Sequence, residues 1–296
     1  ALGLEGIYRQ TGVHAAGVVI TPKPLTEYLP VMQKGEGQPL LTQWDMHRTE
    51  EVGVLKVDFL ALRNLDVIDM AVENIEKRYG VVIDTEDIPI DDTKIYEELS
   101  KGDTMGVFQM ESPGMVEMTV AVRPEVFEDI MAIQSLYRPG PMGSGMDKMF
   151  VNRKHGRQAY SVPHPLLDDI LRPSHGIMLY QEDVLNTTRA ITGWGAGEAD
   201  NLRKAIGKKQ LDKIGSYREK FVSDAQVQGI DKGVSNKIYS DIEYFAGYGF
   251  NRAHAASYSM VSYVTAWFKS YYPAEYMAAC LTSMVNKKDR LTQYLN

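Results

Sequence analysis

The spacing of apolar residues changes once along this chain, at about residue 62, and the change separates two regions that must fold differently. Before it, "HAAGVVIT" and "GVLKVDFL" are rich in β-branched and apolar residues, and the proline-broken "TPKPLTEYLP" lies between them, a pattern that predicts strands. From Leu62 onward apolar residues recur three and four apart, which predicts a helix to about Arg78. The change of period therefore predicts an α+β fold.

The rest of the chain is predicted to be almost entirely helical, beginning with a short helix from about Thr93. We expect further helices over residues 113–121, 125–136, 180–192, 197–206, 210–228, 234–244, 253–271 and 274–285. Proline and glycine separate them at "YRPGPMGSG", "TGWGAGE" and "AGYGFN". The sequence thus predicts a small β-containing region followed by a much larger helical one.

Composition limits the class of protein. The chain has 296 residues, of which 44% are hydrophobic, enough for a substantial core. The single cysteine, Cys280, excludes an intramolecular disulfide and is expected to be a small core residue. The longest uncharged run, residues 253–268, is shorter than the roughly 20 residues of a membrane span and contains serines, so we expect a buried helix and no membrane association.

Charge is distributed unevenly along the chain. The formal net charge of −7 argues against a protein that coats nucleic acid without selectivity. Residues 201–220, "NLRKAIGKKQLDKIGSYREK", nevertheless contain seven Lys or Arg and two acids. The composition leaves a local basic groove open there, although such a run is more commonly a solvated helix face. The chain begins at Ala1 with no leader pattern, and we expect the start of the natural protein to lie upstream.

Two charged residues interrupt the apolar strand in "GVLKVDFLALRNLDVI". Because side chains alternate across a strand, Lys56 and Asp58 are expected on one face, with Leu55, Val57 and Phe59 on the other, core-facing side. The charged face carries either chemistry or a cross-strand ion pair, and the ion pair is the commoner meaning of an isolated Lys-x-Asp. The local pattern leaves both open.

Two further stretches bear on ligand binding. In "AGYGFNRAHAASYS" glycines flank Tyr248, and Asn251, Arg252 and His254 follow at the start of a helix. Amide donors, the positive charge and an aromatic ring could there receive a phosphate-bearing planar ligand. The alternative is a loop in which Tyr248 packs and His254 is a core residue. In "YRPGP" two prolines are expected to hold Arg138 in a rigid loop, which suits either a ligand contact or an ordinary turn.

Seven motifs, taken in their order along the chain, carry a resemblance to a known family. They are "GVHAAGVVI", "LKVDFLALRNL", "GVFQMES", "YRPGP", "GIMLYQEDV", "LRKAIGKK" and "AGYGFNRAHAASY". The chain resembles the bacterial replicative polymerases of the C family, the DNA polymerase III α subunits, over nearly its whole length. The resemblance implies the end of the thumb or a connection at 1–13, the C-terminal part of the palm at 14–63, and the fingers at 64–296.

The resemblance implies a catalytic role for the strand. Asp58 matches the third catalytic aspartate of the family, a ligand of one of two Mg²⁺ ions, and Lys56 would touch the phosphates of the nucleotide. The family's other two aspartates form an Asp-x-Asp pair, and no such pair occurs in these 296 residues. We therefore expect the pair upstream of Ala1 and expect this segment alone not to polymerise. His14 and Gly17 match a palm segment near the active centre, without an assigned role.

The resemblance also implies where the nucleotide binds. Arg203 and Lys204 match the paired basic residues that meet the triphosphate, Tyr248 matches the residue that stacks on the nascent base pair, and His254 lies near the sugar. The remaining expected nucleotide contacts are Lys208, Asn251 and Arg138. Expected partners are primer–template DNA, deoxynucleoside triphosphates and, in the complete protein, the sliding clamp and other replisome subunits, all in the bacterial cytoplasm.

Two other functions remain open at this point. A non-catalytic helical module could use the basic stretch from Arg203 to Lys220 to follow a phosphate backbone, and it would leave Asp58 in a distant ion pair. A two-metal nuclease would also need carboxylates, but it has no need of a base-stacking Tyr248 or of a basic cluster sized for a triphosphate. A polymerase requires Asp58 to face the same cleft as Arg203 and Tyr248.

Overall fold

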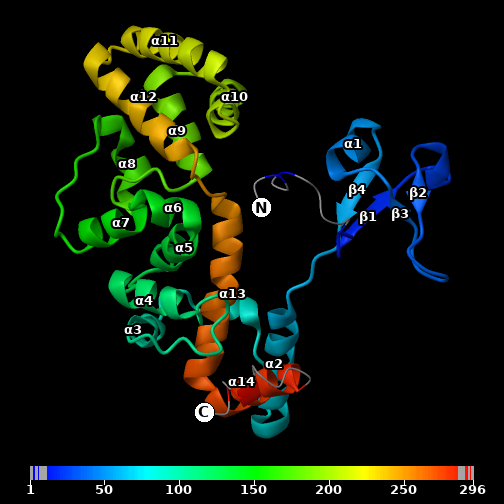
Figure 1. The fold of residues 1–296 in the computed structure, drawn as a ribbon. Helices are drawn as coiled ribbons and strands as arrows, with labels where there is room; N and C mark the ends of the chain where they lie inside the picture. The colour runs from blue at the N-terminus through cyan, green and yellow to red at the C-terminus, as the bar shows by residue number, and fades with distance from the viewer. Residues whose placement is uncertain (1–2, 4–5, 7–11, 286–290, 293, 295–296) are drawn as a thin grey trace. The chain divides into compact units, whose positions relative to one another are not determined.

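The computed structural model describes residues 3, 6, 12–285, 291, 292 and 294 (Figure 1). The chain separates into two compact units, Ala1–Leu62 and Arg63–Asn296, each of which is described by itself. The boundary coincides with the change of apolar spacing, since the first helix of the larger unit begins at Arg63. The predicted α+β class, with a small strand-containing part and a large helical part, is confirmed.

The amino-terminal unit is built from two short antiparallel strand pairs and one helix. These elements are β1 (Gly17–Ile20) paired with β4 (Leu55–Asp58), β2 (Val31–Met32) paired with β3 (Leu41–Thr42), and α1 (Met46–Glu51). Asp45 caps α1 by accepting a hydrogen bond from the Arg48 amide. Among the described residues of this unit, only Leu29 and Thr49 are buried, so its core is small.

The register of β1 with β4 places the two charged side chains on one face of the strand pair, and the burial of the opposite, apolar face differs from the prediction. Gly17 lies opposite Asp58 and Val19 opposite Lys56, so the predicted shared face of the two charges is confirmed. The expected core face is wrong, because Leu55 is 59% exposed and Phe59 is 66% exposed. A ribbon of two strands provides no second layer by itself, and the part of the unit that the structure describes leaves this apolar face uncovered.

The regular secondary structure in the described residues of the carboxy-terminal unit is helical, apart from one isolated bridge between Tyr180 and Phe250. Its helices are α2 (Arg63–Tyr79), α3 (Thr93–Ser100), α4 (Pro113–Val122), α5 (Phe127–Leu136), α6 (Pro139–Ser144), α7 (Met146–Lys154), α8 (Asp168–Leu171), α9 (Gln181–Thr192), α10 (Ala196–Gly207), α11 (Leu211–Val227), α12 (Lys232–Ala246), α13 (Arg252–Tyr271) and α14 (Pro273–Met284). Each predicted long helix is present.

The three short helices α6, α7 and α8 were not predicted. The stretch "YRPGP" was expected to be a rigid loop, but Pro139 is the first residue of α6, where a missing amide hydrogen costs nothing. Arg138 precedes it in an extended conformation with φ −145° and ψ 153°. Helices α6 and α8 have six and four residues, too few for an apolar spacing to repeat. Helix α7 follows directly on the glycine- and proline-rich stretch that was expected to be a loop.

Helix α13 runs through the middle of the carboxy-terminal unit in Figure 1 and is held by buried hydroxyl groups. Ser259 donates to the Gln134 side chain of α5 at 3.1 Å, and Ser262 donates to the carbonyl of Phe108 at 2.8 Å. Thr265 accepts from the amide of Phe108 at 3.0 Å. The expected buried helix is confirmed, and no helix among the described residues is long and apolar enough to cross a membrane.

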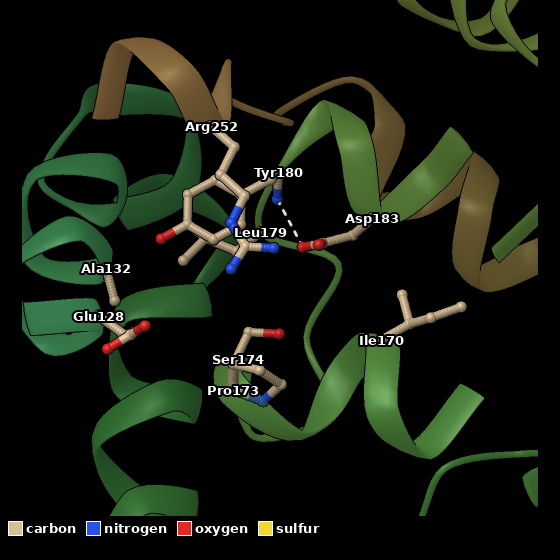
Figure 2. A pocket seen from close by; sticks show the side chains of 9 residues that line it. All are labelled: Glu128, Ala132, Ile170, Pro173, Ser174, Leu179, Tyr180, Asp183 and Arg252. Carbon is tan, nitrogen blue, oxygen red and sulfur yellow. Dashed lines mark hydrogen bonds between the residues drawn. The ribbon is translucent and has the colours of Figure 1, made fainter. Parts of the chain in front are cut away.

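A buried acid lies beneath the start of α13 (Figure 2). Asp183, in the first turn of α9, is only 3% exposed, and its Oδ2 accepts a hydrogen bond from the Tyr180 amide at 2.8 Å. The Arg252 guanidinium lies over the Tyr180 ring, 5.5 Å from its centroid. Between these groups is a cavity of about 10 Å³, roughly the space for one water molecule. Burial raises the pKa of Asp183 to about 7.

We predict that Asp183 makes stability depend on pH. Its pKa is higher in the folded chain than in the unfolded one, so its contribution to the free energy of unfolding falls as pH rises from about 4 to about 7. A difference of about three pKa units corresponds to on the order of 4 kcal/mol. Asp183→Asn keeps an acceptor for the Tyr180 amide and should remove this fall in urea unfolding. Asp169→Asn, at a side chain that is 99% exposed, is the control, and equal pH dependence in the two variants would contradict the prediction.

Candidate functional site

The amino-terminal unit carries a group of four residues that we call the Asp58 cluster: His14, Gly17, Lys56 and Asp58. Lys56 Nζ donates to Asp58 Oδ1 at 2.5 Å. The Lys56 side chain is 13% exposed and the Asp58 side chain 40%. The hydrogen bond from Lys56 lowers the pKa of the Asp58 carboxyl, so the group is ionised at neutral pH and reachable from solvent.

His14 shapes the backbone beside this carboxylate. Its Nδ1 accepts hydrogen bonds from the amides of Ala16 at 3.2 Å and Gly17 at 2.7 Å. A nitrogen that accepts carries no proton, so the neutral ring holds its proton on Nε2. Nδ1 also lies 3.9 Å from Asp58 Oδ1, but an ion pair there would require a proton on the nitrogen that accepts both amides. The observed role of His14 is to close the turn that leads into β1.

Gly17 keeps the space beside the carboxylate open. A Cβ at this position would lie 3.1 Å from Asp58 Oδ1 and 3.0 Å from His14 Nδ1, closer than ordinary contact. Because Gly17 is paired with Asp58 across the ribbon, any side chain here would stand on the same face as the carboxylate. Sequence reasoning gave this glycine no role, since the contact depends on strand register.

In the carboxy-terminal unit, Arg203 and Lys204 share one counter-ion that the sequence analysis missed. Arg203 Nε and Nη2 both lie 2.8 Å from Asp200 Oδ1, and Lys204 Nζ lies 2.6 Å from Asp200 Oδ2. The hydrogen bonds from Lys204 and then Arg203 lower the pKa of Asp200. An acid three and four residues before two cations on a helix is a recognisable pairing pattern, and it would have identified Asp200.

Lys204 also lines a basic cleft at the end of α10. The cleft has a volume of about 380 Å³, and its polar lining includes Lys204, Lys208, Lys213, Asn201 and Tyr217. Three lysines around one cleft of this size suit a phosphate-bearing ligand. Lysines near a helix C-terminus also stabilise the helix dipole, which is the purely structural explanation for Lys204 and Lys208.

Arg138 and Tyr248 are brought together by the fold. Arg138 Nη2 donates to the carbonyl of Tyr248 at 3.2 Å, and its guanidinium carbon lies 4.2 Å from the centroid of the Phe250 ring. Tyr248 is 37% exposed. The guanidinium predicted to contact the nucleotide is thus engaged with the loop between α12 and α13, and the tyrosine ring is accessible.

The first turn of α13 is satisfied by protein groups. Asn251 Oδ1 accepts from the amide of His254 at 2.8 Å, and Glu182 accepts from the amide of Arg252 at 2.9 Å and from Asn251 Nδ2 at 3.3 Å. The Glu182 carboxylate therefore occupies the position at which this helix end would bind an anion. The His254 ring is exposed and stacks on Tyr258, with 4.0 Å between centroids, so His254 is not a core residue.

The predicted residues form separate groups. Lys56 and Asp58 lie in the amino-terminal unit, while the Asp200 pairs, the basic cleft and the Tyr248 loop lie in the carboxy-terminal unit. Within the described residues no set of three or more His, Cys, Asp or Glu side chains is arranged to hold a metal ion. Asp58 offers one carboxylate, which fits one ligand of Mg²⁺ but not a complete site.

Comparison with known proteins identifies both regions of the chain. Residues 64–229 match the family described as the bacterial DNA polymerase III alpha subunit finger domain, and residues 1–61 match the bacterial DNA polymerase III alpha NTPase domain.

Full-length relatives match almost the whole chain. The DNA polymerase III subunit alpha of Aquifex aeolicus is 44% identical over 286 residues, which cover 97% of this chain and 24% of that protein. The subunit of Pseudomonas aeruginosa is 43% identical over 300 residues, 98% of this chain and 26% of the relative. The subunit of Thermus aquaticus is 43% identical over 300 residues, which cover 100% of this chain and 24% of that protein. The chain spans about a quarter of the length of these relatives, and it belongs to the family of bacterial DNA polymerase III α subunits.

Proposed function

We propose that this chain is a segment of the nucleotidyl-transfer core of a bacterial replicative DNA polymerase. Its substrates in the complete protein would be primer–template DNA and deoxynucleoside triphosphates. Membership of the α subunit family supports the class of reaction. The observation that carries the proposal is the Asp58 carboxylate, which is ionised, exposed, held by Lys56 and kept accessible by Gly17.

In the proposed site, Asp58 would interact with positively charged Mg²⁺, and Lys56 with the negatively charged phosphates of the nucleotide. Mg²⁺, when bound, would lower the pKa of the primer hydroxyl and neutralise the leaving pyrophosphate. Asp58 would be one ligand of such an ion, and Lys56, on the same strand face, would compensate phosphate charge. The other carboxylates would come from the rest of the complete protein, because the described residues supply only this one to the cluster.

In the carboxy-terminal unit, Arg203, Lys204 and Lys208 would bind the triphosphate, and the Tyr248 ring would stack on the base pair being formed. Stacking suits an enzyme that accepts four different bases, since every base has a flat face. His254 would lie beside the sugar, where its exposed imidazole excludes a 2′-hydroxyl. Asn251 would act by fixing the first turn of α13, through its hydrogen bond with the His254 amide.

The alternative of a non-catalytic binding module finds less support. Its basic stretch would have to present cations along one phosphate backbone. Arg218 is instead paired with an acid of its own, Glu243, and Lys220 with both Glu198 and Asp224. Arg203 and Lys204 differ, since they share a single carboxylate and keep a net positive charge. Contacts with the sliding clamp and other replisome subunits remain expectations for the complete protein.

We predict that Asp58→Asn in the complete α subunit abolishes nucleotide incorporation while leaving the fold intact. Loss of a charged metal ligand removes transition-state stabilisation, and single-turnover extension should slow by on the order of 10³-fold or more. Glu51→Gln, which removes another exposed carboxylate of the same unit, is the control. If Asp58 only neutralised Lys56, extension by Asp58→Asn would stay within about tenfold of wild type.

We predict that Arg203→Ala and Lys204→Ala mainly raise the KM for nucleotide, because each cation would meet phosphate in both ground and transition states. Each ~1.4 kcal/mol of binding lost should raise KM by about tenfold. Arg172→Ala is a matched control, since Arg172 pairs with Asp168 four residues earlier as Lys204 pairs with Asp200. Weak primer–template binding with a normal KM for nucleotide would instead make this helix a DNA-backbone contact.

We predict that His254→Ala raises ribonucleotide incorporation relative to deoxyribonucleotide. Removing the exposed imidazole opens space for a 2′-hydroxyl, so the ribo-to-deoxy ratio of kcat/KM should rise by about tenfold or more. Ser257→Ala, at an exposed position one turn along α13, should leave the ratio unchanged. A lower Tm with an unchanged ratio would show that His254 only packs against Tyr258.

A further inference from the structure

Gly140 accommodates the ring of Tyr248. A Cβ at Gly140 would lie 2.9 Å from Cδ1 and 3.3 Å from Cε1 of that ring. Gly140 lies within α6 and is not one of the glycines with positive φ, so its backbone conformation does not require glycine. What requires glycine is the close approach of the ring.

Arg138, two residues earlier, binds the same loop through its guanidinium. Its Nε donates to the carbonyl of Ser135 at 2.8 Å, and its Nη2 donates to the carbonyl of Tyr248 at 3.2 Å. The guanidinium also lies over the Phe250 ring, 4.2 Å from its centroid. One side chain thus connects the end of α5 with both aromatic residues of the loop.

The loop is fixed at other points as well. Phe250 donates to the carbonyl of Leu179 at 3.1 Å and accepts from the amide of Gln181 at 2.8 Å. At the far end of α6, Tyr244 donates to the carbonyl of Ser144 at 3.1 Å. The backbone around Tyr248 is therefore held from both sides, while the residue as a whole remains 37% exposed.

We propose that Arg138 and Gly140 form a seat that holds the Tyr248 ring in the orientation needed to stack on a base. This inference rests on the stacking role proposed above for Tyr248. It makes Arg138 a positioning residue that acts through the loop, in place of the direct nucleotide contact expected from the sequence. A ring fixed in advance loses little conformational freedom when a ligand binds, so the seat acts on nucleotide affinity.

The test compares two alanine substitutions in α6 of the complete α subunit. Nothing lies within 4 Å of a Cβ built at Gly143, in the same helix. Since alanine favours helix over glycine, Gly143→Ala should keep or raise Tm and leave nucleotide KM unchanged. Gly140→Ala should lower Tm and raise KM for all four deoxynucleotides by about five- to tenfold, with kcat nearly unchanged.

Double variants show whether the effect passes through the ring. In a Tyr248→Ala background the obstructing atoms are gone, so adding Gly140→Ala or Arg138→Lys should change KM no further. Arg138→Lys alone should raise KM, because lysine keeps the charge but not the three contacts. An equal rise in KM with and without the tyrosine ring would overturn the seat, as would a Gly140→Ala variant with normal KM when Tyr248→Ala raises KM.

The same variants separate failure of the seat from failure of the proposed function. If Tyr248→Ala leaves KM unchanged, the stacking role is wrong. The proposed effect of Arg138 and Gly140 on nucleotide affinity is then wrong as well. In that case Tm alone tests whether Arg138 and Gly140 hold the Tyr248 ring in place. A loss of Tm in Gly140→Ala that disappears in the Tyr248→Ala background supports it, and additive losses overturn it.

Discussion

Buried hydroxyl groups fix helix α13, and the arrangement of the carboxy-terminal unit depends on them. Ser262 and Thr265 can also donate to carbonyls of their own helix. The buried Phe108 backbone and the Gln134 side chain, however, find their partners in Ser259, Ser262 and Thr265, and a buried polar group without a partner is costly. Apolar side chains alone would allow the helix to slide or rotate more freely. Directional bonds to two separate segments fix its rotation, and the loop that enters its first turn is placed accordingly.

Sequence periodicity was sufficient for the long helices, because an apolar face repeats several times in each. It was insufficient for α6, whose six residues "PGPMGS" resemble a loop in composition. It also misplaced the core of the amino-terminal unit. Alternation correctly predicts that Lys56 and Asp58 share a face, but it cannot tell which face another layer covers, and the side containing Leu55 and Phe59 is exposed.

The candidate site shows the same division between local and non-local information. The pairing of Asp200 with Arg203 and Lys204 follows from helical spacing and could have been found in the sequence. The opposition of Gly17 and Asp58 depends on a register between strands nearly forty residues apart. The contact between Gly140 and Tyr248 joins two helix ends more than a hundred residues apart, and no local pattern encodes it.

Asp200 would make the anion binding proposed for Arg203 and Lys204 an exchange of one partner for another. Both cations are already bound to a carboxylate, so an incoming anion gains only the difference between its own attraction and that of Asp200. A singly charged anion offers little more than the resident carboxylate does. A ligand with several adjacent negative charges can interact with both cations at once, and its attraction to them then exceeds that of the Asp200 carboxylate. At the proposed nucleotide site, the resident acid would thus make a generally basic surface discriminate by charge density.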